Sequence, residues 1–366
     1  MPNSSTNLLA CQRKAISYMR NYALKHKTTA KNNIAEILKM ANIHPDTYHE
    51  LTQLLIHQGK VAIHFHPDRP DHSMKTVLEN LLEQGIYKSQ FETHISAGDL
   101  TAYPGGARDL WEKRLFHGAY HVTGVIERDR PKYGTLNLLY ASDGPSPRFG
   151  SCYFLLTPDV SKRCTFTYLG SQSNPKEKGT IDQFDDILAS VLSDIFFYEH
   201  AFGEKGIDLA SFFERTKRNL EEAYCDPALI HPSRNLNYFI EAQVHGTISL
   251  SDDIELLVAD PSFIATPYES LLRELSKKYA FNILWSPGFK MDIEDVPCNF
   301  RGNTMPSLAK AIAENGIVTA RTIGKGVMDV CQNPEKWRSR GSSSSTIQEF
   351  KLLWHVLVKY GKHVCE

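Results

Sequence analysis

The sequence lacks the marks of an exported or membrane protein. It has no run of about 18 continuous apolar residues, which a membrane-spanning helix would require. Its first residues, Met1 to Asn7, are polar and do not form the positive, apolar and small-residue pattern of a secretory signal. The seven cysteines are odd in number and include no CxxC pair, which indicates reduced thiols. We therefore expect a cytosolic protein without a Sec signal and without a membrane partner.

A bias of charge is also missing. Lysine and arginine number 41 against 42 acidic residues, for a formal net charge of -1. This balance gives no sequence-wide electrostatic reason to bind nucleic acid. With 366 residues, of which 42% are hydrophobic and 23% charged, the chain can form one large core with a satellite element or two modest domains. It is long enough for an enzyme, and we expect a monomer that does not bind nucleic acid.

Helical and strand-like patterns follow one another in an order that favours an α+β fold. Residues 8–57 carry apolar positions at helical spacing. Strand-like runs cover residues 61–66, 136–140, 152–156, 238–245 and 254–258. A purely helical block stands between the third and the fourth run. An antiparallel sheet split by a helical insertion explains this order better than βαβ repetition does.

These patterns divide the chain into four parts. Residues 1–58 are a helical lead-in, and residues 59–175 together with 236–335 form the core. Residues 176–235 are the helical insertion. Residues 336–366 comprise a serine-rich flexible linker and a C-terminal helix.

The first candidate functional residues lie at the end of the predicted strand 61–66. His64 and His66 share one face of that strand, and Asp68 and Arg69 follow where a proline ends it. Functional groups collect at such strand ends. The plain alternatives are a satisfied sheet histidine for His64 and a loop-stabilising ion pair for Asp68 and Arg69.

Two later segments carry further candidates. Residues 148–154 enter a strand through Gly150, so the backbone can approach a flat ligand closely, although a tight turn explains the same residues without a ligand. In residues 238–246, Glu241 interrupts apolar residues at the mouth of a strand. Burial of an unpaired carboxylate is costly and no cation is adjacent in sequence, so this pattern favours a functional glutamate.

In this order, the segments resemble the signature of the poly(ADP-ribose) polymerase-like ADP-ribosyltransferases. Residues 66–69 read His-Pro-Asp-Arg where that fold has His-Gly-Ser-Arg. Residues 81–86, 149–154 and 240–245 are similar to its Gln-Gly-Leu helix end, its Phe-Gly-Lys-Gly-Ile-Tyr-Phe strand and its Asn-Glu-Tyr-Ile-Val-Tyr strand. The resemblance implies an ADP-ribosyltransferase-like split antiparallel sheet with a helical N-terminal region and a helical insertion. Pro67 replaces a glycine whose N–H holds the nicotinamide carboxamide, so that contact would have to come from elsewhere.

The chain looks even more like the CteC-like effectors, which ADP-ribosylate ubiquitin on threonine. The similar stretches are 64–70, 89–93, 104–106, 116–120, 131–134, 146–151, 241–246 and 260–263. This similarity implies transfer of a single ADP-ribose from NAD⁺, without a metal, to a threonine hydroxyl of ubiquitin, which would block ubiquitination. It also implies a virulence effector or toxin that is secreted into the cytosol of a host cell.

Residue by residue, the resemblance implies an Asp–Glu catalytic pair. The glutamate matches Glu241. The aspartate matches Asp68, with Asp143 open as the alternative. The NAD⁺-binding residues that the resemblance implies are His66, Arg69, Phe149, Gly150, Ser151 and Tyr153, with Phe166 or Tyr168 to stack on nicotinamide.

A protein acceptor requires a docking surface. We expect it on the helical insertion, residues 176–235, with the loop of residues 89–118 as a second contact. The plain alternative is that the insertion only completes the core.

Two other functions stay open. His64, His66 and Asp68 form a His-x-His-x-Asp pattern that could hold a metal in a hydrolase. Further ligands would come from His94, His117, His121 or His245. Fifteen histidines make such a set unsurprising, and no HExxH or Cys-His spacing supports it. The third function is that of a non-catalytic module that binds ubiquitin or a peptide.

Overall fold

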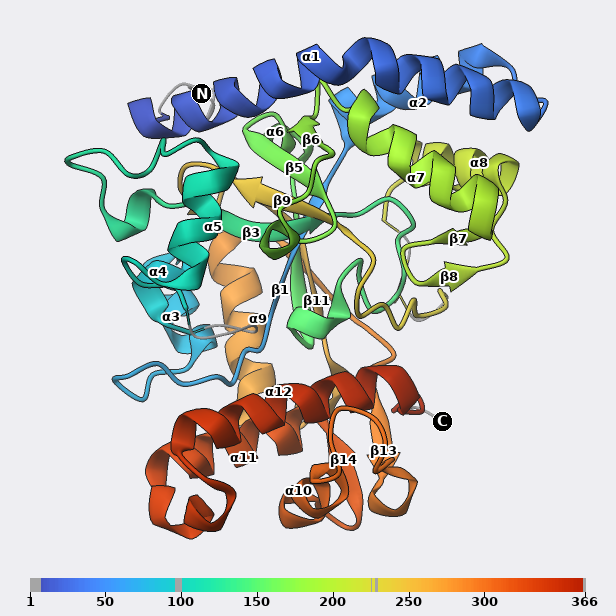
Figure 1. The fold of residues 1–366 in the computed structure, drawn as a ribbon. Helices are drawn as coiled ribbons and strands as arrows, with labels where there is room; N and C mark the ends of the chain where they lie inside the picture. The colour runs from blue at the N-terminus through green and yellow to red at the C-terminus, as the bar shows by residue number, and fades with distance from the viewer. Residues whose placement is uncertain (1–7, 96–100, 225, 228–229, 365–366) are drawn as a thin grey trace.

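The structure is a computed structural model that describes residues 8–95, 101–224, 226–227 and 230–364. One large β-sheet lies at its centre, with helices around it (Figure 1). The N-terminal helices lie at one end of the molecule, and the C-terminal helices lie at the opposite end. This arrangement confirms the mixed helical and strand character that the sequence predicts.

Eight strands form the central sheet. Their order is β12 (Asn282–Trp285), β11 (Ile254–Ala259), β4 (Cys152–Leu156), β1 (Val61–Phe65), β3 (Lys132–Leu136), β9 (Ile240–Val244), β5 (Cys164–Tyr168) and β6 (Lys178–Thr180). Neighbouring strands are antiparallel except β11 and β12, which are parallel. The sheet is therefore mixed: the antiparallel pairing that the sequence predicts is present throughout except at this edge.

The pairing of β1 differs on its two sides. Against β4 it keeps four register pairs, from Ala62 to Phe65, but against β3 it keeps only two, at Val61 and Ala62. Beyond Ala62, β1 and β3 separate. The predicted strand 136–140 is wrong in position, because β3 ends at Leu136 and Tyr140 has a φ of 51°, which a strand does not tolerate.

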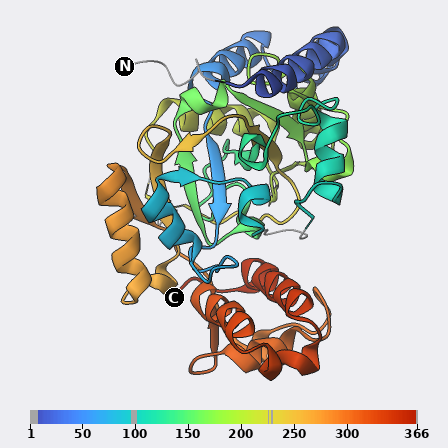
Figure 2. The same ribbon diagram turned by 90° about the vertical axis from the view of Figure 1, so that its left-hand side faces the viewer.

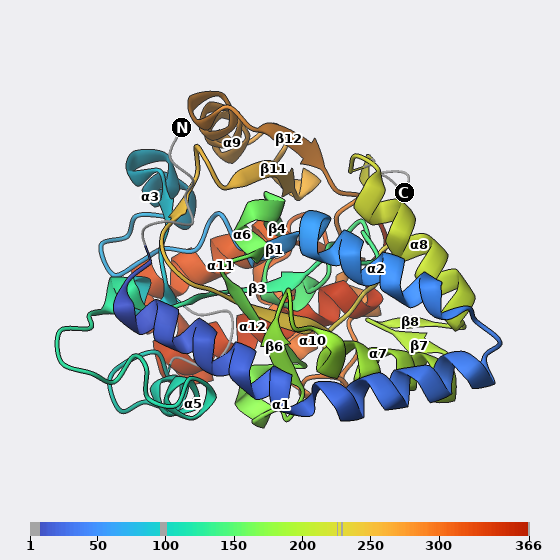
Figure 3. The ribbon, with the colours of Figure 1, turned by 90° about the horizontal axis from the view of Figure 1, so that it is seen from above.

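The helices α1 (Ala10–Met40) and α2 (Pro45–Gln58) cover one side of the sheet. Seen from above, α1 runs along α7 (Asp185–Tyr198), and α2 lies beside α8 (Leu209–Glu221) (Figure 3). The residues of α7 and α8 share one continuous core with the sheet, which includes Ile187, Phe212 and Phe166. The segment 176–235 is not purely helical, because it also holds β6 and the hairpin of β7 (His200–Ala201) and β8 (Glu204–Lys205).

The segment between β1 and β3 begins with α3 (Val77–Gln84) and β2 (Ile86–Tyr87). The predicted loop of residues 89–118 is not wholly irregular, because it holds α4 (Gln90–Thr93) and α5 (Ala107–Leu115). Strand β2 pairs with β10 (Ile248–Ser249), and the short helix α6 (Pro158–Ser161) joins β4 to β5. Residues 96–100, in the predicted loop of 89–118, lie outside the described residues.

The C-terminal segment forms a group of helices below the sheet. After α9 (Pro267–Tyr279), the helices α10 (Met305–Ile312), α11 (Ala320–Gln332) and α12 (Ser343–Tyr360) pack together beside β13 (Lys290–Asp292) and β14 (Ile317–Thr319) (Figure 2). The prediction of a flexible serine linker is wrong. Ser342 accepts a hydrogen bond from the N–H of Ser345 and so caps α12, which is a role that serine favours.

Candidate active site

A cavity of about 430 Å³ lies where β1 and β3 separate. Its walls come from β1, β3 and β9 of the sheet, from α3, α4 and α5 beside it, and from α11 and α12 below it. Four of the residues predicted to be catalytic or to bind NAD⁺ line this cavity: His66, Arg69, Phe149 and Glu241. Three segments that are far apart in the sequence therefore meet around one space.

Glu241 is placed in the cavity by the alternation of β9. Ile240 and Ala242 point into the hydrophobic core, so Glu241 faces the opposite way. Its side chain is 7% exposed, and its Oε1 accepts hydrogen bonds from the N–H of Ser171 (3.2 Å) and from Nε2 of Gln243 (3.0 Å). Burial raises the pKa of Glu241 above its ordinary value, while the charge of Arg108 and these two hydrogen bonds oppose that rise.

Arg108 is the functional candidate that the sequence reasoning missed. It lies in the first turn of α5 and lines the cavity together with Trp111. Its guanidinium lies 4.5 Å from the ring centroid of Tyr133 and 5.5 Å from that of Trp111. Its Nε and Nη1 are buried and have no hydrogen-bond partner within the described residues. A ligand in the cavity could satisfy these donors.

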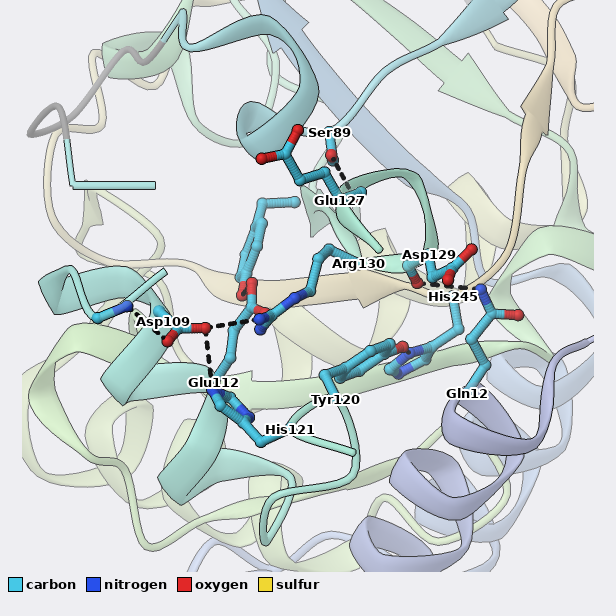
Figure 4. Close-up of polar contacts among 12 residues, drawn as sticks. Gln12, Ser89, Asp109, Glu112, Tyr120, His121, Glu127, Asp129, Arg130 and His245 are labelled. Carbon is cyan, nitrogen blue, oxygen red and sulfur yellow. Dashed lines mark hydrogen bonds and ion pairs between the residues drawn. The ribbon is translucent and has the colours of Figure 1, made fainter. Parts of the chain in front are cut away.

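A buried ion-pair network holds α5 in place (Figure 4). Arg130 donates to Glu112 (2.9 Å) and to Asp109 (2.6 Å), both on α5. Tyr133 of β3 donates to the second oxygen of Glu112 (2.7 Å), and a ring nitrogen of His121 lies 2.9 Å from Asp109. Because Glu112 is only 1% exposed, these bonds are shielded from water. The network therefore fixes the helix that presents Arg108 to Glu241.

The cavity is rich in positive charge. Glu241 is the one carboxylate among the described residues that line it, against six basic side chains: Arg69, Lys88, Arg108, Lys132, Arg148 and Lys351. Several of these groups already donate within the protein. Lys132 directs its three ammonium donors at backbone carbonyls, Arg148 donates to the carbonyl of Leu236, and Arg69 donates to Asp68. This charge balance favours an anionic ligand.

At the end of the cavity near α12, Arg69 and His66 lie close together. Arg69 donates from Nη1 to Asp68 (3.2 Å), while its Nη2 is buried without a hydrogen-bond partner in the described chain. Burial, with the nearby charges of Arg69 and Lys351, lowers the pKa of His66 well below its ordinary value, so this imidazole is neutral. Its ring packs edge-on against Trp354 of α12, 5.2 Å away.

Asp68 contacts α11. It is 2% exposed, and a Cβ at Gly324 would lie only 1.5 Å from its Oδ2, so glycine is required at that position. Burial raises the pKa of Asp68 to about 6, against the opposing charge of Arg69. Through its Oδ1, Asp68 holds the guanidinium of Arg69.

The open alternative, Asp143, lines a different space. This second cavity of about 10 Å³ is also lined by Gly150, Ser151 and Tyr153. Asp143 accepts hydrogen bonds from the backbone N–H groups of Ser233 and Arg234, both at 2.8 Å. The hydroxyl of Tyr153 lies 2.6 Å from that of Tyr224. These three predicted residues around Asp143 are thus separated from Glu241 and its cavity.

Gly150 has a packing role as well. A Cβ at this position would lie 2.4 Å from the backbone of Phe65, so glycine allows the chain to pass directly against β1. The close approach that the sequence indicated is present, but it is made to a strand.

The two aromatic candidates for nicotinamide stacking face the helical side of β5. Phe166 is fully buried and packs edge-on against Phe184, with 5.4 Å between ring centroids. The hydroxyl of Tyr168 donates to Asp194 of α7. Thr165 and Thr167 occupy the face of β5 that is paired with Gln243 and Glu241. The aromatic rings that line the cavity are instead those of Phe65, Tyr87, Trp111, Tyr133 and Phe149.

Of the histidines of the rival metal hypothesis, His64, His66 and His94 line the cavity around Glu241, whereas His117, His121 and His245 do not. Within the described residues, no group of three or more His, Cys, Asp or Glu side chains is arranged to hold a metal ion. The two ring nitrogens of His64 lie 3.2 Å from the carbonyl of Gly150 and 3.3 Å from the N–H of Ser146. His117 stacks on Tyr18, and His245 contacts Tyr120 and Thr165.

None of the described helices combines the length and the apolar character that crossing a membrane would need.

A search of the curated proteins found no relative that matches the chain. One family model, described as a protein of unknown function (DUF3626), matches residues 60–360, which include every segment that lines the large cavity. The chain belongs to this family.

Proposed function

We propose that this protein is a mono-ADP-ribosyltransferase that transfers ADP-ribose from NAD⁺ to a hydroxyl side chain of a protein. The observation that carries the proposal is the charge pattern of the cavity, in which Glu241 faces six basic side chains. NAD⁺ carries two phosphates beside a ribose that becomes positive as nicotinamide leaves. Basic groups for the phosphates and one carboxylate for the sugar match those two demands.

In the reaction, the bond between C1′ of the ribose and the pyridine nitrogen breaks. Both electrons go to the nitrogen, so nicotinamide leaves as a neutral molecule. The acceptor hydroxyl oxygen forms a bond to C1′ and loses its proton to water. The products are the O-linked ADP-ribosyl protein, nicotinamide and one proton.

Glu241 would stabilise the transition state of this reaction. Positive charge develops at C1′ and on the ring oxygen, as it does in glycosidases, which also use carboxylates. A carboxylate accelerates the reaction if it binds this charged state better than it binds the substrate. The hydrogen bonds that Ser171 and Gln243 donate to Glu241 both use Oε1, which leaves Oε2 for the ribose.

Arg69 and Arg108 are the proposed phosphate ligands, because each has buried N–H groups without a partner in the described structure. Asp68, the aspartate of the proposed Asp–Glu pair, would act through Arg69, whose guanidinium it holds. In this arrangement Asp68 does not contact the reacting atoms. Trp111 and Phe149 are the proposed stacking partners for nicotinamide in place of Phe166 and Tyr168.

For the acceptor we propose a threonine of ubiquitin, on the similarity to the CteC-like effectors. The proposed docking surface lies at the C-terminal end of α7, in the segment 176–235. Two neighbouring aromatic side chains are exposed there, Phe197 at 64% and Tyr198 at 74%. Exposed aromatic residues are frequent anchors of protein interfaces.

The decisive experiment incubates the purified protein with labelled NAD⁺ and ubiquitin and detects modified ubiquitin by mass spectrometry. We expect one ADP-ribose per ubiquitin with the wild type and none with Glu241→Gln, which keeps the size of the side chain. A metal chelator should leave the activity unchanged. Full transfer by Glu241→Gln, or no release of nicotinamide by the wild type with any acceptor, would contradict the proposal.

A further inference from the structure

A row of buried polar side chains leads away from Glu241 along β9 and β5. Gln243, Thr165 and His245 are all 0% exposed, and Tyr120, which follows α5, is 2% exposed. The row is continuous in hydrogen bonds. Nε2 of Gln243 lies 3.0 Å from Oε1 of Glu241, and Oε1 of Gln243 lies 2.8 Å from the hydroxyl of Thr165. Nε2 of His245 lies 3.0 Å from that same hydroxyl, and Nδ1 lies 2.5 Å from the hydroxyl of Tyr120.

The chemistry of each group determines the direction of these bonds. An ionised carboxylate can only accept, so the amide of Gln243 must point its NH₂ at Glu241 and its carbonyl at Thr165. Thr165 has one proton and donates it to that carbonyl, so it can only accept from His245. His245 must therefore carry its proton on Nε2.

The last bond of the row follows from this tautomer. Burial lowers the pKa of His245 to about 3, so the ring is neutral and has one N–H. With the proton on Nε2, its Nδ1 is an acceptor, and Tyr120 donates to it. Figure 4 shows the rings of Tyr120 and His245 side by side, and their planes differ by 6°.

We propose that Tyr120, His245, Thr165 and Gln243 are positioning residues, which form a one-way relay of hydrogen bonds that holds Oε1 of Glu241 and presents Oε2 to the substrate. All four bonds point toward the carboxylate, and bonds aligned in this way polarise one another. The relay thus supports a negative charge that burial alone would disfavour. Its effect on catalysis rests on the proposed function, whereas the direction of its bonds does not.

The kinetic test removes the central link. Thr165→Val keeps the shape of the side chain but deletes the hydroxyl, while Thr165→Ser keeps the hydroxyl. We expect Thr165→Val to lower kcat for nicotinamide release by about 10- to 100-fold, because a misplaced catalytic group costs about this much. The KM for NAD⁺ should stay within about twofold, since the relay does not bind substrate, and Thr165→Ser should restore kcat.

The matched control is Thr216→Val. Thr216 of α8 is also fully buried, and its hydroxyl has no partner within the described residues. This variant makes the same chemical change outside the relay and should leave both kcat and KM unchanged. Equal losses in Thr165→Val and Thr216→Val, or an unchanged kcat in Thr165→Val, would overturn the positioning role.

The spectroscopic test does not depend on NAD⁺. Nitrogen-15 NMR of labelled histidine should show His245 with its proton on Nε2 in the wild type, and Thr165→Val should lose that preference. A wild-type His245 protonated on Nδ1 would overturn the relay. If the tautomer is as expected but the wild type does not cleave NAD⁺, then the proposed function and the catalytic effect fail together while the bond direction stands.

Discussion

The cavity around Glu241 and the cavity around Asp143 differ in the way they use polar groups, although the segment 148–153 contributes to both. The larger one, around Glu241, contains arginine donors that have no partner among the described residues. Two carboxylates line the smaller one: Asp143 accepts hydrogen bonds from backbone N–H groups of a neighbouring loop, and Asp260 accepts one from the N–H of Ser262 in its own turn. Unpartnered buried donors are costly unless a ligand satisfies them. The comparison indicates that the larger cavity binds a ligand, whereas the carboxylates of the smaller cavity stabilise the conformation of loops.

The largest expected effect concerns Glu241 of the larger cavity and Asp143 of the smaller one. We predict that Glu241→Gln lowers NAD⁺ cleavage by on the order of 10³-fold, because it removes the charge that faces the sugar. Asp143→Asn should stay within about threefold of the wild type if it folds normally. Nicotinamide release measures both variants. An active Glu241→Gln beside a folded, inactive Asp143→Asn would reverse the assignment of the two cavities.

A second prediction tests the buried state of Asp68 through the pH dependence of the protein's stability. Burial raises the pKa of Asp68 from its ordinary 3.8 to about 6, so its contribution to stability is present below about pH 4 and is lost as the pH rises through 6. The change corresponds to ~3 kcal/mol. Urea unfolding of Asp68→Asn between pH 4 and 8 should therefore show a weaker dependence on pH than that of the wild type.

The remaining dependence serves as an internal reference in that experiment. Burial also raises the pKa values of Asp143 and Asp260 to about 6, and these two groups are unchanged in the variant. Identical pH profiles for the wild type and Asp68→Asn would show that Asp68 is not the buried, protonatable group that the structure indicates.

The third prediction concerns the phosphates. Arg108→Met and Arg69→Met should each raise the Kd for NAD⁺ by about 10- to 100-fold, because a hydrogen bond to a charged group contributes about 1.5–3 kcal/mol. Isothermal titration calorimetry measures this loss. The control is Arg273→Met, since Arg273 pairs with Glu269 on the exposed surface of α9. If Arg108→Met and Arg69→Met bind NAD⁺ as tightly as Arg273→Met and the wild type do, the larger cavity does not bind the nucleotide.

The smallest effect is expected at the acceptor surface. Replacement of Phe197 and Tyr198 by serine should lower the rate of ubiquitin modification by about 10-fold, in line with the loss of an interface anchor, and leave NAD⁺ cleavage unchanged. Tyr360→Ser alters a side chain that is 48% exposed at the end of α12 and serves as the control. If the replacement of Phe197 and Tyr198 lowers NAD⁺ cleavage and ubiquitin modification equally, α7 only stabilises the core and does not bind the acceptor.

Local patterns predicted those elements whose periodicity is strong. The strands β4 and β9 and the helix α7 lie where apolar spacing indicated, because burial of one face dictates that spacing. Glu241 stood out as a carboxylate within an apolar strand. The helix α5 was missed because its polar sequence resembles a loop. The apolar and aromatic spacing of Trp111 and Leu115 is the signal that could have located it, and with it Arg108.

The chain by itself determined which residues alternate along each strand and that a carboxylate must be accommodated in β9. It could not determine which face of a strand borders a cavity, because that depends on partners distant in sequence. For this reason Phe149 and Ser151, two residues apart, line different cavities, and Phe166 packs against α7. Only the tertiary structure separated β1 from β3 and brought Arg69, Arg108 and Glu241 around one space, since long-range packing and not local preference decides where strands part.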